Sequence, residues 1–445
     1  MPYGSSGRLP AEYASKLGHL DVLNSKLINE LINAFEYSEV HNEPSEQWSS
    51  SADAKADPLN IIFSVDGSFQ NIQSERHAFR EVCFVKTALV RVDPYRLHDI
   101  DPEYPHPTKL QRLMKESAIY HSTVFPLSGI EFPSHTWLDG VRQIICDSLN
   151  DPRTRDIGIW ETLKWIIYRK WTPELRSSSP NFSCPSCGEE IPGIPYDQDS
   201  YSCPNCNQNL SVADVMGFHM EMLEDGASQA LATSYMTIHE LLLLFSAIRY
   251  FWENGRSLLS RILFLKDGPL SLRGQYTKIV PNIRAFLQYA KNNGVPIHLV
   301  GQEKSGRFFE HLQLIERRVP PHSRKEPGSY FILSHDYVRR RIQRVNDAKY
   351  QYGVRTNYGE KVFVKPEPHS AMVLNVAVGE YDLKSDFPSS KDDLIGLDRI
   401  LATIPSILSR QHEGGLIPIQ LAHGVASLSS YPSAHILRVF AGLDS

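Results

Sequence analysis

Two stretches of this 445-residue chain end a hydrophobic run with Asp-Gly: IIFSVDGS at 61–68 and RILFLKDGPL at 261–270. Both runs are rich in β-forming residues. Each therefore predicts a buried strand that carries a carboxylate, Asp66 or Asp267, to the point where the strand meets solvent. Two carboxylates from distant parts of a chain suit divalent-metal phosphodiester chemistry. Asp-Gly is also a common turn dipeptide, so the competing interpretation is that each pair only opens a turn.

A third acid is expected on an apolar helix between the two aspartates. Glu240 stands in SYMTIHELLLLFSAI, where a carboxylate needs a partner or a cation. Two alternatives remain open. Thr237 and Glu240 also fit the S/T-x-x-E spacing of a helix capping box. Glu253, beside Asn254 and Gly255 near the predicted end of the helix, could supply the acid instead.

Two further residues are candidates for the same site. His423 follows the apolar run 416–422, at an expected strand-to-helix junction, and could bind a metal or move a proton, although a single histidine is more often structural. Lys304, in GQEKSG, could neutralise a phosphate, and the competing interpretation is an ordinary turn lysine. Both residues lie outside the two strands, so only the fold can bring them to the aspartates.

The positive charge that could bind nucleic acid is confined to short segments of this chain. The formal net charge is −5, which argues against coating nucleic acid by bulk attraction. A narrow basic channel, or a partner that delivers the nucleic acid, stays compatible with that charge. Arg339 and Arg340 lie in a basic stripe with Arg341 and Arg344, and they are candidate phosphate contacts or part of a solvated face.

Four of the six cysteines follow the pattern C-x2-C-x15-C-x2-C, formed by Cys184, Cys187, Cys203 and Cys206. This spacing predicts a zinc ribbon with four thiolate ligands. Because all four ligands are protein sulfurs, the Zn²⁺ would be structural and not catalytic. The ribbon could contact nucleic acid or a partner, or simply hold an insertion together. The remaining pair, Cys83 and Cys146, is expected to be reduced and to pack in the core.

Strands and helices alternate along the chain, which predicts an α/β or α+β fold. Strands are expected at 61–65, 81–92, 122–126, 262–266 and 328–334, a strand and turn at 296–306, and a hairpin of strands at 361–365 and 370–378, with Gly67 and Ser68 as a turn. Helices are expected at 12–38, 135–149, 159–169, 212–253 (broken near Gly226), 277–293, 308–317 and 393–410, and at the end of 416–430. We predict an N-terminal helical segment at 1–56, a core at 57–134 and 213–445, and a helical insertion at 135–212 with the zinc ribbon at 180–212.

The N-terminus lacks a basic-then-apolar pattern, so no signal peptide is expected. The longest apolar run, around 241–248, is too short to span a bilayer. These features predict a soluble cytoplasmic protein that does not contact a membrane.

The order of these motifs resembles the NurA nuclease family over about residues 10–430. The resemblance is carried by VDGS (65–68), the apolar helix with Glu240, FLKDGPL (264–270), GQEKSG (301–306) and PIQLAH (418–423). It implies an RNase H-like fold, a mixed sheet flanked by helices with catalytic carboxylates at strand ends. Here that fold would carry an inserted four-cysteine zinc ribbon and extra helices.

The resemblance also implies an activity and partners. The activity would be a Mn²⁺-dependent (or Mg²⁺-dependent) DNA nuclease with single-strand endonuclease and 5′→3′ exonuclease activity. The protein would be a homodimer acting with HerA, a hexameric DNA-translocating ATPase, in DNA-end processing for repair or in defence against phage. By motif, Asp66 and Asp267 match metal ligands, His423 matches the late histidine, and Glu240 matches the helical acid.

Two features depart from compact members of that family. The four-cysteine ribbon is absent from the short archaeal form and suggests a bacterial-type, elaborated member. The interval of 27 residues between Glu240 and Asp267 is also longer than expected.

Two other classes of function compete with a nuclease. One is a non-catalytic nucleic-acid-binding or assembly subunit, in which Asp66 and Asp267 would not share a metal. The other is a metallohydrolase acting on small phosphates. The chain contains no GxxxxGK[ST] loop, which argues against intrinsic ATP hydrolysis.

Overall fold

The protein divides into two compact units, Met1–Gln47 and Trp48–Ser445, and each is described by itself. The computed structural model describes residues 25–27, 30, 48–50, 56–74, 80–93, 118–133, 136–154, 157–223, 226–318, 328–347, 352–367, 370–381, 387–409, 414–428, 436, 437 and 439. In the first unit Lys26, Leu27 and Glu30 are helical, and Lys26 Nζ lies 3.7 Å from Glu30 Oε1. The rest of the predicted helix at 12–38 lies outside the described residues.

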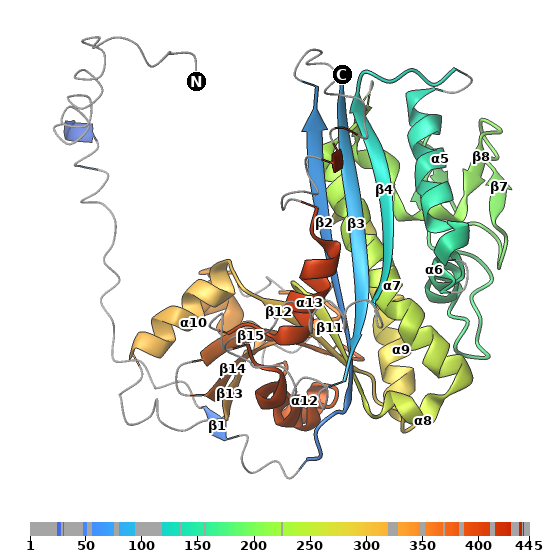
Figure 1. Cartoon of the computed structure of the whole chain (residues 1–445). Coiled ribbons are helices and arrows are strands. Elements are labelled where there is room, and N and C mark those ends of the chain that lie inside the picture. Colours follow the sequence, from blue (N-terminus) through green and yellow to red (C-terminus); the bar gives the residue numbers. More distant parts are fainter. Residues whose placement is uncertain are drawn as a thin grey trace. The chain divides into compact units, whose positions relative to one another are not determined.

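The second unit is built on a mixed sheet of nine strands flanked by helices, which is the architecture that the motif resemblance implies (Figure 1). In spatial order its strands are β1 (Ser49–Ser50), β13 (Ser329–Ile332), β14 (Gly359–Glu367), β15 (Ser370–Ala377), β12 (His298–Glu303), β11 (Ile262–Asp267), β2 (Ile61–Gln73), β3 (Glu81–Val92) and β4 (Ala118–Ser128). The central strand β11 runs parallel to both β2 and β12. The other neighbouring pairs of this sheet are antiparallel.

Both faces of the central strands are covered. Phe63 and Phe264 point into one core, whereas Ile62 and Leu263 point into the other, as expected for side chains that alternate along a strand. The first core is covered by α5 (Trp137–Leu149), α6 (Ile159–Tyr168), α7 (Gln229–Asn254) and α9 (Val280–Asn292). The second is covered by α12 (Leu397–Thr403) and α13 (Ile417–Ala426). Near-continuous apolar strands, like 262–265 here, are typical of a sheet buried on both sides.

Helix α7 crosses the first core and is buried on most of its surface. It begins at Ser228, whose Oγ accepts a hydrogen bond from the Leu231 amide at 3.0 Å. Among the described helices it alone is long and apolar enough to cross a membrane, but 78% of its apolar window is buried inside the protein. That burial is typical of the core helix of a soluble protein. Thr237 lies well inside α7 and donates to the Thr233 carbonyl, so the capping-box alternative for Glu240 is wrong.

The predicted turn at Gly67 and Ser68 is wrong. Strand β2 continues through both residues to Gln73, and they pair with Thr87 and Lys86 of β3. The long antiparallel ladder overrides the local turn preference of Asp-Gly, and Asp66 therefore lies in mid-strand. Asp267, in contrast, is the last residue of β11, and Gly268 turns the chain there with φ of 93°.

Several other elements differ in extent from the prediction. Two 3-10 turns, Val212–Met216 and Phe218–Glu221, and a small hairpin of β9 (Met222–Leu223) and β10 (Gly226–Ala227) precede α7, where one broken helix was expected. The helix expected at 393–410 is α12 followed by a 3-10 turn at Ile404–Ile407. The hairpin expected at 361–378 is confirmed as β14 and β15, and the helix expected at 308–317 as α10 (Arg307–Arg318).

The four cysteines lie in a module of two small hairpins, β5 (Phe182–Ser183) with β6 (Glu190–Ile191) and β7 (Ser200–Ser202) with β8 (Asn209–Ser211). Arg142 of α5 ties this module to the first core. Its Nε and Nη2 donate to the two carboxylate oxygens of Asp214 at 2.8 and 2.6 Å, and Nη2 also donates to the Asn209 carbonyl. Both side chains of this ion pair are buried.

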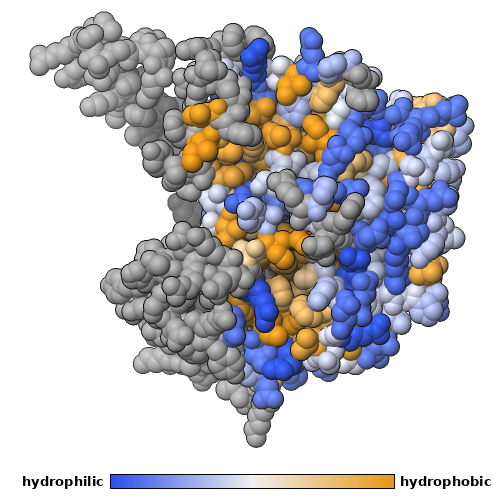
Figure 2. Space-filling view, turned by 45° about the vertical axis from the view of Figure 1, so that its right-hand side comes forward, coloured by the Kyte–Doolittle hydropathy of each residue, from blue (hydrophilic) through white to orange (hydrophobic). Residues whose placement is uncertain are grey.

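Apolar side chains also reach the surface. Figure 2 shows hydrophobic patches on one part of the visible face and a largely hydrophilic surface on its right-hand side. The exposed large apolar residues include Ile119, Tyr120 and Val124, all on the edge strand β4.

Replacing Arg142 with Met should lower the free energy of unfolding by about 3 kcal/mol, because Asp214 would stay buried without its counter-ion. Thermal and urea unfolding measure the change. The double variant Arg142→Met/Asp214→Asn should lose less free energy of unfolding than Arg142→Met alone. As a control, Lys391→Met breaks the exposed Lys391–Asp398 pair and should change the stability much less, because water and salt screen exposed ion pairs. An Arg142→Met protein as stable as the parent would contradict this role.

Candidate active site

Asp66 points toward α13, where it meets His423. His423 Nδ1 lies 2.8 Å from Asp66 Oδ2, and the Gly67 amide donates to Asp66 Oδ1 at 2.8 Å. Asp66 is only 6% exposed, whereas the His423 side chain is 61% exposed. One edge of the imidazole thus holds a buried carboxylate while the ring remains open to solvent. His423 lies in the last turn of α13, a helix that begins at Ile417, and not at the strand-to-helix junction expected.

Asp267 lies beside Asp66 across the parallel pair of β2 and β11. Val65 is in register with Lys266, so the next residues, Asp66 and Asp267, are neighbours on strands about 4.8 Å apart. Burial is the main cause that raises the pKa of the Asp66 carboxyl, and repulsion from Asp267 raises it further. Asp267 Oδ2 accepts a hydrogen bond from Lys304 Nζ at 2.9 Å. The two predicted aspartates, His423 and Lys304 therefore come together at one end of the sheet.

Glu240 reaches the same strands from the opposite face. It projects from α7, is 5% exposed, and its Oε2 lies 2.9 Å from Lys266 Nζ. Its other oxygen lies over Gly67, since a Cβ built on that glycine would come within 2.4 Å of Glu240 Oε1. The absence of a side chain at Gly67 is what allows this approach. Burial raises the pKa of Glu240 despite the Lys266 ammonium, and the nearby Asp66 and Asp267 add to that rise.

The three carboxylates do not converge on one point in this arrangement. Within the described residues, the four cysteines form the one group of three or more His, Cys, Asp or Glu residues whose ligand atoms all lie within 4.8 Å of one another. The physical reason is strand alternation. Asp66 and Gly67 point to opposite faces of β2, and Glu240 meets the face of Gly67. A catalytic role for Glu240 stays a prediction.

Lys266 is a site residue that the sequence reasoning missed. Its Nζ donates to the Asp267 carbonyl at 2.8 Å as well as to Glu240, so it links the α7 acid to the backbone of the strand-end aspartate. The signal was present, because Lys266 is a charged residue in the otherwise apolar run ILFLK and therefore needed a buried partner.

The remaining candidates lie elsewhere. Glu253 is exposed near the end of α7. Arg339 and Arg340 both bind Asp336, with N–O distances of 2.6 and 2.8 Å. Whether either arginine contacts phosphate stays a prediction.

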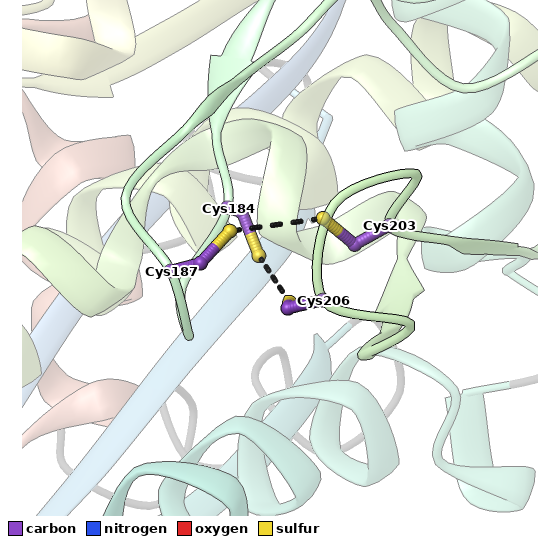
Figure 3. Close-up of side chains that lie close together, drawn as sticks. All are labelled: Cys184, Cys187, Cys203 and Cys206. Carbon is purple, nitrogen blue, oxygen red and sulfur yellow. Dashed lines mark hydrogen bonds between the residues drawn. The ribbon is translucent and has the colours of Figure 1, made fainter.

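The four cysteines are arranged as a metal centre (Figure 3). Cys184 Sγ lies 3.7 Å from Cys206 Sγ, and Cys187 Sγ lies 3.8 Å from Cys203 Sγ. Four sulfurs at about 2.3 Å from a tetrahedral Zn²⁺ would be about 3.8 Å apart, so the spacing fits that ion. Each pair closes a tight turn, in which the amides of Gly188 and Asn207 donate to the first cysteine's carbonyl. Both turn residues have positive φ.

Hydrogen bonds around the ribbon favour thiolates. The Asn205 side chain and the Glu189 amide lower the pKa of the Cys187 thiol to about 6. The amides of its own turn lower the pKa of Cys203. Burial raises the pKa of Cys184 to about 12, so that ligand would depend on a cation to lose its proton. The donor set fits a structural Zn²⁺ with no open position.

No protein-family model and no curated protein matches this chain. Its structure is similar to the crystal structure of the NurA nuclease from Sulfolobus solfataricus, with a TM-score of 0.34 and 9% sequence identity. The similarity covers 97% of this chain and 96% of that chain. This is the family that the sequence motifs resemble, and the function proposed below rests on the geometry of the site.

The ribbon should contain one Zn²⁺ per chain, measured by elemental analysis of the purified protein. Cys206→Ala should weaken zinc retention against a chelator and lower the melting temperature, because one of four thiolates is lost. Cys146→Ala is the matched control: Cys146 lies outside the cluster, with its thiol donating to Ser211. Retention of zinc by Cys206→Ala at the parent's level would contradict the assignment.

Glu240→Ala should lower the free energy of unfolding by about 3 kcal/mol, because Lys266 would stay buried without its counter-ion. If the two side chains act as a pair, Glu240→Ala/Lys266→Met will lower the free energy of unfolding by less than the sum of the two single variants. A double-mutant cycle from urea unfolding measures this coupling. Strict additivity would show that the two side chains act independently.

Proposed function

We propose that this protein is a metal-dependent nuclease that cleaves DNA phosphodiesters at Asp66 and Asp267. One observation carries the proposal. Two carboxylates from distant parts of the chain lie on adjacent parallel strands, near enough for Asp267 to raise the pKa of Asp66. Carboxylates that repel each other at one site are stabilised by a shared cation, and their oxygens are the ligands that Mn²⁺ and Mg²⁺ prefer.

Asp66 and Asp267 are the residues that would hold the cation. When bound, the cation neutralises charge on the phosphate and lowers the pKa of a bound water. His423 has Nδ1 fixed on Asp66, so its other ring nitrogen is positioned to accept or donate a proton at the solvent side. Lys304, whose side chain is 43% exposed, holds Asp267 and can donate to a phosphate oxygen. Lys266 positions the Asp267 backbone, and Glu240 in turn holds Lys266.

The finer parts of the proposal follow from the motif resemblance. They are single-strand endonuclease and 5′→3′ exonuclease activity, Mn²⁺ as the preferred cation, and a homodimer acting with a HerA-type hexameric ATPase in the cytoplasm, in repair or phage defence. The net charge of −5 is compatible with a nuclease to which a motor delivers DNA. The exposed apolar residues of the edge strand β4 are compatible with self-association.

A second candidate is a non-catalytic nucleic-acid-binding or assembly subunit. The observation that favours it is the position of Glu240, which meets the sheet on the face opposite Asp66. The two candidates differ in whether the chain cleaves DNA at all.

Asp66→Asn and Asp267→Asn should each lower the rate of DNA cleavage at least about 100-fold, because each removes an anionic ligand. The assay uses single-stranded and duplex DNA with Mn²⁺ or Mg²⁺, with and without the ATPase partner. Glu253→Gln is the matched control and should keep the parent's rate, since Glu253 is exposed away from the aspartates. Undiminished cleavage by Asp66→Asn would exclude this site as the catalytic one.

The same variants separate loss of chemistry from loss of folding. The raised pKa of Asp66 means that the folded protein binds this proton more tightly than the unfolded chain does. Its contribution to stability is therefore present at low pH and is lost as pH rises through the folded-state pKa. Asp66→Asn should thus melt no lower than the parent at neutral pH. Mn²⁺ should raise the melting temperature of the parent but not of Asp66→Asn.

A further inference from the structure

A pocket of about 1000 Å³ opens beside Asp267. Its walls come from three segments far apart in sequence: 267–273 after β11, 302–308 between β12 and α10, and 352–357 before β14. Lys304 and Asp267 both line it, so the pocket continues directly from the candidate active site. The chemistry of its lining shows what it could hold.

The pocket has an excess of positive charge. Lys304 pairs with Asp267, and Lys361 pairs with Glu303. Three further lining residues, the exposed Arg273, Arg307 and Arg355, have no carboxylate within ion-pair distance in the part of the chain that the structure describes. Arg307 Nη1 donates to Gln343 Oε1 at 3.3 Å. Guanidinium groups without a carboxylate partner around one concavity are suited to phosphate oxygens, which they bind with two parallel hydrogen bonds.

Polar groups and backbone amides add to this lining. The α10 N-terminus, where Ser305, Gly306 and Arg307 line the pocket, is the positive end of a 12-residue helix. Gln302 is 1% exposed, its Nε2 donates to the Gly414 carbonyl, and its Oε1 has no hydrogen-bond partner among the described residues. A buried acceptor of this kind needs a donor from water or from a ligand.

Three of the lining residues are buried: Gln302 on β12, Asn357 just before β14 and Lys361 on β14. The volume lies at the upper end of the range of ligand pockets, roughly 300–1,000 Å³, and leaves room for terminal nucleotides. Tyr352, which packs against the buried Phe308 with ring centroids 5.8 Å apart, supplies the aromatic lining on which a base could stack.

We propose that this pocket binds the phosphorylated end of a single DNA strand, with Arg273, Arg307 and Arg355 contacting its phosphates. The position of the scissile bond at Asp66 and Asp267 rests on the proposed function, but binding of the strand end does not. The pocket would then set how many nucleotides lie beyond the cleaved bond, and so the length of the released product.

The test measures binding without cleavage. Asp66→Asn protein is titrated, with a chelator of divalent cations present, into one fluorescent single-stranded oligonucleotide prepared with a 5′-phosphate, with a 3′-phosphate, or with hydroxyl groups at both ends. One of the two phosphorylated ends should bind about tenfold more tightly than the hydroxyl form, because a terminal phosphate adds charge-assisted hydrogen bonds. That end gives the polarity of the strand. Equal binding of all three oligonucleotides would overturn the proposal.

Arginine variants locate the effect. Arg273→Gln/Arg307→Gln/Arg355→Gln, added to Asp66→Asn, should remove the preference for the phosphorylated end. It should also reduce the slope of log Kd against log salt by about two, as expected for three lost contacts to a single strand. Arg261→Gln is the matched control, because Arg261 is an exposed arginine just before β11, at the opposite end from Asp267. A triple variant that keeps the preference would also overturn the proposal.

The two proposals fail separately. If the parent does not cleave DNA but the three arginines still control binding of the strand end, the nuclease proposal is lost and the pocket assignment stands. If the parent cleaves DNA while end phosphates and the arginines have no effect on binding, the pocket assignment is lost alone.

Discussion

The candidate site depends on the parallel pairing of β2 with β11. Their register sets Val65 opposite Lys266 and so makes Asp66 and Asp267 neighbours. A slip of one residue would send one aspartate to the opposite face of the sheet. The two apolar cores hold this register. The first core takes Phe63 and Phe264, and the second core takes Ile62 and Leu263. Packing energy on both faces thus fixes the distance between two charges that repel each other.

A glycine in mid-strand connects the two faces of this sheet. Gly67 leaves room for the Glu240 carboxylate to lie against the backbone next to Asp66. Lys266 then joins Glu240 to the Asp267 carbonyl. Helix α7 is therefore coupled to both aspartates through backbone and a buried ion pair, without contributing a side chain to their face.

Much of the fold could be predicted from sequence because its signals are local. The strand ILFLKD, the CxxC pairs and the amphipathic segments are each readable within a short window. The mid-strand position of Asp66 could not be read in that way, since the preference of Asp-Gly for a turn was overridden by pairing with β3, residues 81–92. The face on which Glu240 meets the sheet also depends on packing. The basic pocket could not be foreseen either, because its three wall segments lie about 35 to 90 residues apart in sequence.

The continuity of the first core has a consequence for how the second unit unfolds. Cys184 and Cys203 of the ribbon, Ile145 of α5, Leu241 of α7 and Val65 of β2 all belong to one hydrophobic cluster. This cluster runs from the insertion to the strand that carries Asp66. The ribbon and the aspartates thus belong to one cooperative unit. Local unfolding near the zinc ribbon would therefore lower the stability of the strands that carry the aspartates.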